Sequence, residues 1–181
     1  MNDTIDIAAL EAAQLVIIHY PDERLARLSR ELRPEEITPA MGPLLQRMFE
    51  LMEQGPGVGL AAPQVGINLR FFVANATGEP EDKRVYINPV IIAGEGWAEN
   101  EEGCLSLPGI SCRLKRRATV TVRALDANGN VFEETGTDLL ARIFQHEIDH
   151  LDGTTIADRM STVAKLANRR ALKRLEEEAG K

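Results

Sequence analysis

The residues with the most obvious chemical capability are His146, Glu147 and His150, which form an H-E-x-x-H motif. When this motif lies on a helix, its two histidines project from the same face, so both imidazoles can bind one metal ion. The carboxylate between them can accept and deliver protons next to that ion. The alternative is a helix whose histidine and glutamate side chains only hydrogen-bond within a core. The spacing favours the metal site.

The segment around the motif has the composition of a buried helix. Thr137 and Asp138 are suitable residues for its N-cap, and Gly153 suits the position just after its end. Apolar residues fall on more than one side of this predicted helix, as expected at the centre of a domain: Leu139, Leu140, Ile143, Phe144, Ile148 and Leu151. Histidine and glutamate without partners would be costly there, and a bound metal ion would satisfy them.

A catalytic metal ion of this type usually has three protein ligands and one open position, so one ligand remains to be found. A metzincin would have a further histidine at position 156, where this chain has Ile156. A thermolysin-like peptidase would use a downstream glutamate, and the glutamates at 176–178 lie at the end of a charged segment. Cys104 is the better candidate, because a thiolate and two imidazoles can hold Fe(II), Zn(II), Ni(II) or Co(II). Cys112 has the features of an ordinary thiol.

A glycine-rich segment at residues 55–66 is a second candidate for ligand contact. Its glycines at 55, 57 and 59 allow the backbone to approach a ligand closely. Gln64 follows them, and its neutral amide can donate a hydrogen bond to a developing oxyanion. The segment matches neither a phosphate loop nor a dinucleotide-binding fingerprint.

The overall composition indicates a globular protein. The chain has 181 residues, of which 44% are hydrophobic and 27% are charged. We expect a single metallohydrolase domain at residues 15–181, preceded by an N-terminal extension at residues 1–14. The formal net charge of −7 argues against general nucleic-acid binding, and we expect no specific DNA partner. Two cysteines are too few for a disulfide scaffold, and no signal peptide or membrane span is recognisable. We therefore expect a cytoplasmic protein without membrane contacts.

The order of the predicted elements indicates the fold class. Apolar residues at helical spacing predict a helix at residues 43–54, and residues 15–18 form a short buried segment. Strands are expected at residues 70–75, 85–87, 90–92, 118–125 and 131–133, with Asn88-Pro89 as a break and Asn128-Gly129 as a hairpin turn. Because the strands come before the H-E-x-x-H helix, we predict an α+β fold. In it, mostly antiparallel β-sheets pack around that central helix, and a C-terminal helix follows.

The C-terminal helix is predicted at residues 161–179, with Ser161 or Thr162 as its N-cap and Gly180 at its end. Val163, Leu166 and Leu175 mark part of its apolar side. The helix also carries a group of basic residues: Lys165, Arg169, Arg170, Lys173 and Arg174. A solvated face is the simpler interpretation of these charges, and a docking surface for an acidic or RNA-containing partner is the alternative.

Three segments taken together resemble the signature motifs of the peptide deformylase family. They are Gly57-Val58-Gly59-Leu60-Ala61-Ala62-Pro63-Gln64, Glu102-Gly103-Cys104-Leu105-Ser106 and Gln145-His146-Glu147-Ile148-Asp149-His150. They occur in the family's order with similar separations. The segment His19-Tyr20-Pro21-Asp22-Glu23-Arg24-Leu25 also resembles the start of bacterial members. The resemblance covers nearly the whole chain apart from the first dozen residues.

The resemblance implies an enzyme that removes the formyl group from the N-terminal formylmethionine of new polypeptides and releases formate. It implies one divalent metal ion, Fe(II) in many members and replaceable by Zn(II), Ni(II) or Co(II), bound by Cys104, His146 and His150. Glu147 would act as general base and then general acid in the attack of metal-bound water on the formyl carbon. Gln64 and the backbone N–H of Leu105 would stabilise charge on the formyl oxygen.

The substrate and partners follow from the same resemblance. We expect the formylmethionyl peptide to lie extended and to pair with backbone near Val58-Gly59 and Gly109-Ile110. The methionine side chain would occupy an apolar pocket formed by Val58, Leu105, Leu139 and Ile143, for which plain core packing is the alternative. Contact with the ribosome through the basic C-terminal helix is a further hypothesis.

Three rival functions remain open from the sequence. One is a zinc endopeptidase with a glutamate ligand from the C-terminal helix. A second is a thiol hydrolase in which Cys104 acts with a histidine base. The third is a non-catalytic metal-stabilised module that binds peptide termini, against which the presence of both Glu147 and Gln64 argues.

Overall fold

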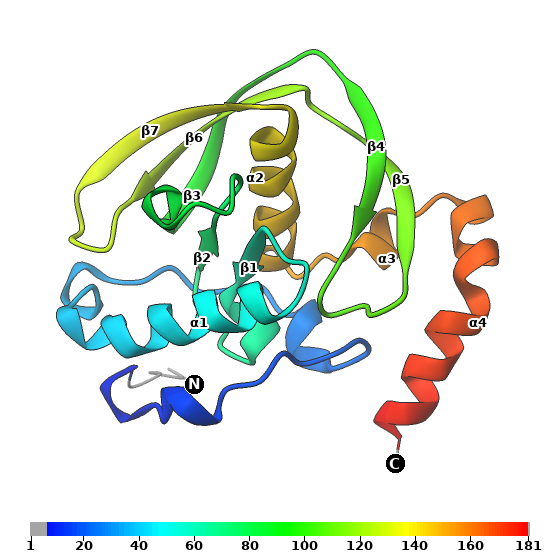
Figure 1. Cartoon of the computed structure of the whole chain (residues 1–181), viewed down its shortest axis with the longest axis horizontal. Helices are drawn as coiled ribbons and strands as arrows, with labels where there is room; N and C mark the ends of the chain where they lie inside the picture. Colours follow the sequence, from blue (N-terminus) through cyan, green and yellow to red (C-terminus); the bar gives the residue numbers. More distant parts are fainter. Residues whose placement is uncertain (1–6, 181) are drawn as a thin grey trace.

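The computed structural model describes residues 7–180, which form two antiparallel sheets and a central helix (Figure 1). The larger sheet has strand order β1-β2-β3-β6-β7, and β4 and β5 form a separate two-stranded sheet. The strands are β1 (Gly59–Ala61), β2 (Phe71–Ala74), β3 (Arg84–Glu95), β4 (Ala98–Gly103), β5 (Ser111–Arg116), β6 (Thr119–Leu125) and β7 (Val131–Thr137). The helices are α1 (Gly42–Gln54), α2 (Asp138–Leu151), α3 (Ile156–Arg159) and α4 (Thr162–Ala179). The predicted α+β class with antiparallel sheets and a C-terminal helix is confirmed.

Helix α2 lies between the larger sheet and the β4–β5 hairpin in Figure 1. Its apolar residues, among them Phe144 and Leu151, join Phe72 and Tyr86 of the sheet in one buried cluster. Thr137 occupies the N-cap position as predicted, although its side chain makes no capping hydrogen bond. Gly153 follows the helix with φ +71°, and a Cβ there would lie 2.7 Å from the Ala26 carbonyl oxygen. Because glycine has no Cβ, the chain can turn at the end of α2 while it packs closely against the backbone of Ala26.

The apolar face of α1 is buried, as its helical spacing predicts, and includes Leu44, Met48 and Met52. The N-terminal segment is less regular. Of the predicted extension at residues 1–14, residues 1–6 lie outside the described residues. Ile7 belongs to the same core cluster as α1. The segment at residues 15–18 is not the buried one that we predicted, because Val16 is 60% exposed and its neighbours are only half buried.

One long strand, β3, replaces the two short strands predicted on either side of Asn88-Pro89. The register against β6 shifts between Ile87 and Val90, and Asn88 has φ +50°. This irregularity accommodates a proline that cannot donate a ladder hydrogen bond. The Asn88 side chain accepts a hydrogen bond from Leu32 N at 2.9 Å and donates to Leu32 O at 2.8 Å. A bulge therefore occupies the place where a strand end was predicted.

The hairpin formed by β4 and β5 was not predicted as strand. Strand β4 has the polar sequence Ala-Glu-Asn-Glu-Glu-Gly, which shows neither helical nor strand periodicity. Strand β5 does alternate, and it buries Cys112, Leu114 and Arg116 on one side. The pairing aligns Gly103 with Ser111, so Cys104 begins the turn between the two strands.

The C-terminal helix α4 forms as predicted, and Ser161 Oγ accepts a hydrogen bond from Ala164 N at 3.2 Å. The predicted apolar side is wrong in part, because Val163 is 78% exposed and Leu166 is 69% exposed. Nine residues span two and a half helical turns, so Leu166 and the buried Leu175 project from opposite sides. In the described part of the chain, no helix combines the length and the apolar character needed to cross a lipid bilayer.

Candidate metal centre and active site

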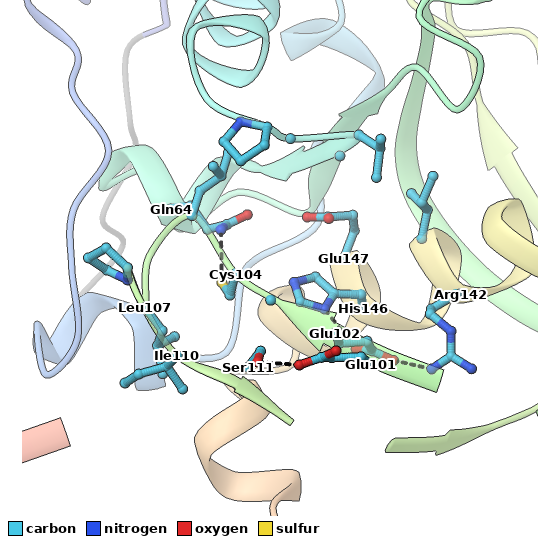
Figure 2. Close-up of a pocket in the computed structure, with 18 of the residues that line it drawn as sticks. Gln64, Glu101, Glu102, Cys104, Leu107, Ile110, Ser111, Arg142, His146 and Glu147 are labelled. Carbon is cyan, nitrogen blue, oxygen red and sulfur yellow. Dashed lines mark hydrogen bonds and ion pairs between the residues drawn. The ribbon is translucent and has the colours of Figure 1, made fainter. Parts of the chain in front are cut away.

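Two segments far apart in the sequence bring the side chains of Cys104 and His146 to one place (Figure 2). His146 and His150 lie on α2, and Cys104 follows β4. The Cys104 Sγ atom lies 3.2 Å from His150 Nε2, and one ligand atom from each of the three residues lies within 4.8 Å of the others. The imidazole rings of His146 and His150 have their centroids 5.0 Å apart. The structure thus brings together the three residues proposed from the sequence as metal ligands.

The chemistry of this group fits a divalent metal ion. One sulfur and two imidazole nitrogens form a donor set used for zinc and for other transition metals. Burial lowers the pKa of His150 well below its ordinary value, and the neighbouring charges of His146 and Arg116 lower it further. The imidazole is therefore neutral, which is the form that binds metals. Cys104, His146 and His150 are a group that could hold one metal ion.

His146 is oriented from behind by a carboxylate. Its Nδ1 atom lies 3.0 Å from Glu102 Oε2, which leaves Nε2 for the side of Cys104. Burial lowers the pKa of His146, but hydrogen bonds with Cys104 and Glu102 outweigh burial and raise it well above its ordinary value. A carboxylate that holds the second nitrogen of a ligand histidine fixes the tautomer and the ring orientation.

Glu102 itself belongs to a buried ion-pair network. Arg116 donates to both of its oxygens at 2.8 and 2.9 Å, and Arg142 donates at 2.5 Å. Arg116 also donates to Asp149 at 2.6 Å. Burial raises the pKa of Glu102, but its bonds with Arg116 and His146 outweigh burial and hold the pKa well below its ordinary value. Glu102 is therefore an anion behind the candidate metal ligands.

The sequence did not identify this network. Glu102 lies within a recognised motif, but nothing in the spacing assigns it a partner. The available signal was the alternation of β5, which places Arg116 on the same buried side as Cys112 and Leu114. A buried arginine requires a carboxylate partner.

Glu147 lies in the cavity with only 3% of its surface exposed. Its Oε2 atom is buried and has no hydrogen-bond partner among the described residues. Burial raises the pKa of Glu147 to about 7, and the charge of His146 opposes this effect. A carboxyl group with a pKa near neutrality can both accept and deliver a proton.

Gln64 faces the same space from the 3-10 helix Ala62–Val65, which follows β1. Its Oε1 atom accepts a hydrogen bond from Ala61 N at 2.8 Å. Its Nε2 atom donates to Ser106 Oγ at 3.3 Å and to Cys104 Sγ at 3.5 Å. Because the oxygen is held by backbone, the amide nitrogen is directed toward the ligand group. The sequence did not identify the contact with Ser106.

A cavity of about 690 Å³ opens beside these residues. Its lining includes every residue that the sequence proposed for substrate contact: Val58, Gly59, Leu105, Gly109, Ile110, Leu139 and Ile143. Leu139 is 46% exposed, whereas Ile143 is buried. The lining also includes Gln64, Cys104, His146 and Glu147, so the apolar walls and the polar group share one cavity.

Comparisons with known proteins agree with this geometry. The family model described as Polypeptide deformylase matches residues 14–166. A peptide deformylase of Thermodesulfovibrio yellowstonii is 43% identical over 163 residues, covering 89% of this chain and 98% of that relative. The peptide deformylase of Stenotrophomonas maltophilia is 40% identical over 161 residues, covering 88% of this chain and 95% of that relative.

Solved structures give the same result. A crystal structure of a peptide deformylase from Legionella pneumophila matches with a TM-score of 0.83 at 39% identity, covering 91% of this chain and 96% of that one. A peptide deformylase from Plasmodium falciparum matches with a TM-score of 0.85 at 36% identity, covering 90% of this chain and 95% of that one. The resemblance inferred from three motifs is therefore confirmed, and this chain belongs to the polypeptide deformylase family, whose enzymes remove the formyl group from the N-terminal methionine of polypeptides.

Proposed function

We propose that this chain hydrolyses the formyl group of N-formylmethionyl peptides with the help of a divalent metal ion held by Cys104, His146 and His150. The formyl C–N bond breaks, water supplies the oxygen of the released formate, and the peptide keeps a free amine. The supporting observation is the convergence of a sulfur and two imidazoles at the end of a cavity that also contains Glu147.

The residues around the candidate ligands have distinct roles in this proposal. When bound, a divalent cation acts as a Lewis acid and makes water available as a nucleophile near neutral pH. Glu147 takes the proton from the attacking water and then delivers it to the departing amine. The Gln64 amide and the backbone N–H of Leu105 donate hydrogen bonds to the formyl oxygen as it gains negative charge. Glu102 keeps His146 in the orientation that binds the ion.

The substrate is proposed to enter as an extended peptide. Its backbone would pair near Val58-Gly59 and Gly109-Ile110, which lie on the cavity wall. The methionine side chain would occupy the apolar space bounded by Leu105, Leu139 and Ile143. We propose Fe(II) as the ion in the cell, with Zn(II), Ni(II) or Co(II) able to replace it. Since the substrates are newly made chains, we place the protein in the cytoplasm.

The test combines metal analysis of protein purified without oxygen with a formate-release assay on a formyl-Met peptide. We expect close to one metal ion per chain and release of formate. The variant Cys104→Ala should lose both the ion and the activity. Cys112→Ala is the matched control, because Cys112 is the other free cysteine and lies outside the group of candidate metal ligands. Retention of metal and activity by Cys104→Ala would contradict the proposal.

A thiol hydrolase is the second candidate, because the 3.2 Å contact between Cys104 Sγ and His150 Nε2 also suits a thiol and its base. That enzyme would remain active after chelation and would be inactivated by alkylation whether or not metal is present.

An endopeptidase would instead cleave internal peptide bonds and tolerate Cys104→Ser. Its glutamate ligand would come from α4, where Glu176 accepts a hydrogen bond from the Tyr20 hydroxyl. A non-catalytic module would bind formylated peptides without releasing formate.

The exposed face of α4 is proposed to contact the ribosome. Lys165, Arg169 and Arg170 are exposed on this helix. Val163 and Leu166 add apolar surface near its start. Co-sedimentation with ribosomes should weaken in the double variant Arg169→Glu/Arg170→Glu and with rising salt. Unchanged co-sedimentation of this variant would contradict the contact.

A further inference from the structure

A second cavity, of about 600 Å³, opens along β5. It shares no lining residue with the cavity that contains the candidate metal ligands. We call it the Trp97 groove, after the tryptophan that precedes β4. Its exposed lining side chains include one aromatic, one aliphatic and four basic residues: Trp97, Ile91, Arg113, Lys115, Arg117 and Arg159.

Cations outnumber carboxylates in the Trp97 groove. Five arginine and lysine side chains line it, against two carboxylates. Both carboxylates are already paired. Glu99 lies 3.6 Å from the guanidinium of Arg113, and Asp149 pairs with Arg116 at 2.6 Å and with Arg159 at 2.5 Å. The acidic groups of the groove are therefore neutralised before any ligand binds.

Lys115 and Arg117 supply the remaining positive charge. Both side chains are exposed, and within residues 7–180 neither has a carboxylate at ion-pair distance. The whole chain carries a formal charge of −7, so this excess of cations is local. A local concentration of one sign of charge attracts ligands of the opposite sign.

An exposed aromatic ring adjoins these two cations. Trp97 is the only tryptophan of the chain and is 56% exposed. The guanidinium carbon of Arg117 lies 4.0 Å from the centroid of the indole, and the ammonium of Lys115 lies 5.1 Å from it. The groove therefore offers a flat ring and two cations within a few ångströms of one another.

The position of Arg117 is fixed by its neighbours. Its backbone N–H donates to Gln145 Oε1 at 2.9 Å, and Gln145 Nε2 donates to the Arg117 carbonyl oxygen at 3.0 Å. Its side chain also lies close to Gly94, where a Cβ would be 3.1 Å from Arg117 Cγ. A cation that is already held in place loses less conformational freedom when a ligand binds.

This combination of groups matches the chemistry of single-stranded nucleic acid. Phosphates pair with lysine and arginine, and bases stack on aromatic rings and on guanidinium planes. An acidic peptide would use the cations but has no flat ring in each residue to stack on the indole. The contact between Trp97 and Arg117 therefore favours a nucleic acid over an acidic peptide.

We propose that the Trp97 groove binds single-stranded RNA without strong sequence preference. The choice of RNA rests on the proposed function, because newly made chains emerge from a particle that contains RNA. The groove is a different surface from the basic face of α4, since Lys165, Arg169 and Arg170 are not among its lining residues.

Trp97 supplies the first readout, because all tryptophan emission of the chain comes from this one residue. The metal-loaded full-length chain is titrated with hexauridylate. A base that stacks on the indole should quench the emission, with a dissociation constant of about 10⁻⁶–10⁻⁴ M at physiological salt. Unchanged emission at RNA concentrations up to about 10⁻³ M, well above that range, would overturn the proposal.

The double variant Lys115→Gln/Arg117→Gln tests the cations, with binding measured by the anisotropy of labelled hexauridylate. Loss of two phosphate contacts should weaken binding and make the slope of log affinity against log salt shallower by about 1.4. Arg84→Gln/Arg123→Gln is the matched control, because it removes two exposed cations that lie outside the groove. Equal losses in the two variants would show a general charge effect and contradict the proposal.

Two substitutions of Trp97 test the stacking. Trp97→Ala should lower the affinity for RNA about 5- to 100-fold, whereas Trp97→Phe should keep most of it because a phenyl ring still stacks. Both variants should release formate at the rate of the unchanged chain, because Trp97 lies outside the active cavity. Equal RNA affinity of Trp97→Ala and the unchanged chain would overturn the role assigned to the ring.

Competition distinguishes RNA from an acidic protein partner. Poly-L-glutamate at the same concentration of charge should displace little of the labelled RNA, because it cannot stack on Trp97. Displacement as strong as that by unlabelled RNA would overturn the proposal in favour of an acidic partner. The reaction is tested separately. Release of formate without RNA binding would contradict only the RNA site, and RNA binding without release of formate would contradict only the proposed function.

Discussion

The carboxylate of Glu147 lies directly against Gly59, so closely that a Cβ at position 59 would be 2.5 Å from Glu147 Oε1 and 2.9 Å from its carboxyl carbon. A contact shorter than 3.0 Å requires one partner to move. The end of the glutamate side chain is the part that can move, because the backbone of β1 is fixed by its pairing with β2. Glycine at this position therefore defines where the proposed general base lies.

Gly59→Ala should consequently reduce activity more than stability. Displacement of a catalytic group by about 1 Å can cost about 10²-fold in rate. We expect kcat/KM for formate release to fall by about that factor, while metal content is retained. Gly42→Ala is the matched control, because a Cβ at Gly42 would have nothing within 4 Å. Equal activity of the two variants would show that the contact does not position Glu147.

Gln64→Ala should lower kcat with little effect on metal content. The amide nitrogen of Gln64 contacts Cys104 Sγ only at 3.5 Å, so the ligand group does not depend on it. Loss of one preorganised donor to an oxyanion typically costs about 10²–10³-fold in kcat. The measurements are kcat from steady-state kinetics and the metal content of the same preparation. A variant with normal kcat and a raised KM would assign Gln64 to substrate binding instead.

Glu102→Gln should weaken metal binding and destabilise the chain. Loss of the carboxylate behind a ligand histidine typically costs about 10- to 100-fold in metal affinity. Breaking a buried pair costs about 3–5 kcal/mol, since Arg116 and Arg142 lose their shared carboxylate. The measurements are the rate of metal loss to a chelator and the free energy of unfolding.

Glu133→Gln is the control for that variant, because Glu133 pairs with Arg123 on the surface, where both side chains are about half exposed. Surface substitutions of this kind usually change the free energy of unfolding by less than about 0.5 kcal/mol. Similar metal loss from both variants would remove the orienting role assigned to Glu102.

Tyr86→Phe should destabilise the larger sheet without affecting the metal. The Tyr86 ring is fully buried, stacks on Phe72 with centroids 4.6 Å apart, and its hydroxyl donates to Glu134 at 2.7 Å. A hydrogen bond to a charged group contributes about 1.5–3 kcal/mol. Denaturant unfolding should show a loss of that size. Tyr20→Phe is the control, since its exposed hydroxyl contacts Glu176 at 3.3 Å. Equal losses would contradict the assignment.

Local sequence patterns were sufficient for the parts of the fold that depend on local structure. Helical spacing and capping residues predicted α1, α2 and α4, and the turn at Asn128-Gly129 predicted the hairpin of β6 and β7. The H-E-x-x-H spacing predicted His146 and His150 as metal ligands. Cys104 was selected as the third ligand because a thiolate suits a site with two imidazoles. The residues that the sequence proposes for substrate contact all line one cavity.

Features that depend on distant partners were not predictable in this way. Strand β4 is polar on both sides, and its extended form depends on pairing with β5. The role of Glu102 depends on Arg116 and Arg142, which lie 14 and 40 residues away. Leu166 was assigned to the wrong side of α4 because the sequence alone does not show which face meets the body of the protein.

The ion pairs around Glu102, which contacts His146, also determine whether the protein should stay folded when no metal ion is bound. In small zinc modules the ion itself drives folding, and chelators denature them. Here the charges of Glu102 and Asp149 are compensated inside the protein by Arg116 and Arg142 before any ion arrives. The apoprotein should thus remain folded with its imidazoles already arranged, so that one cation can be exchanged for another by simple dialysis rather than by refolding.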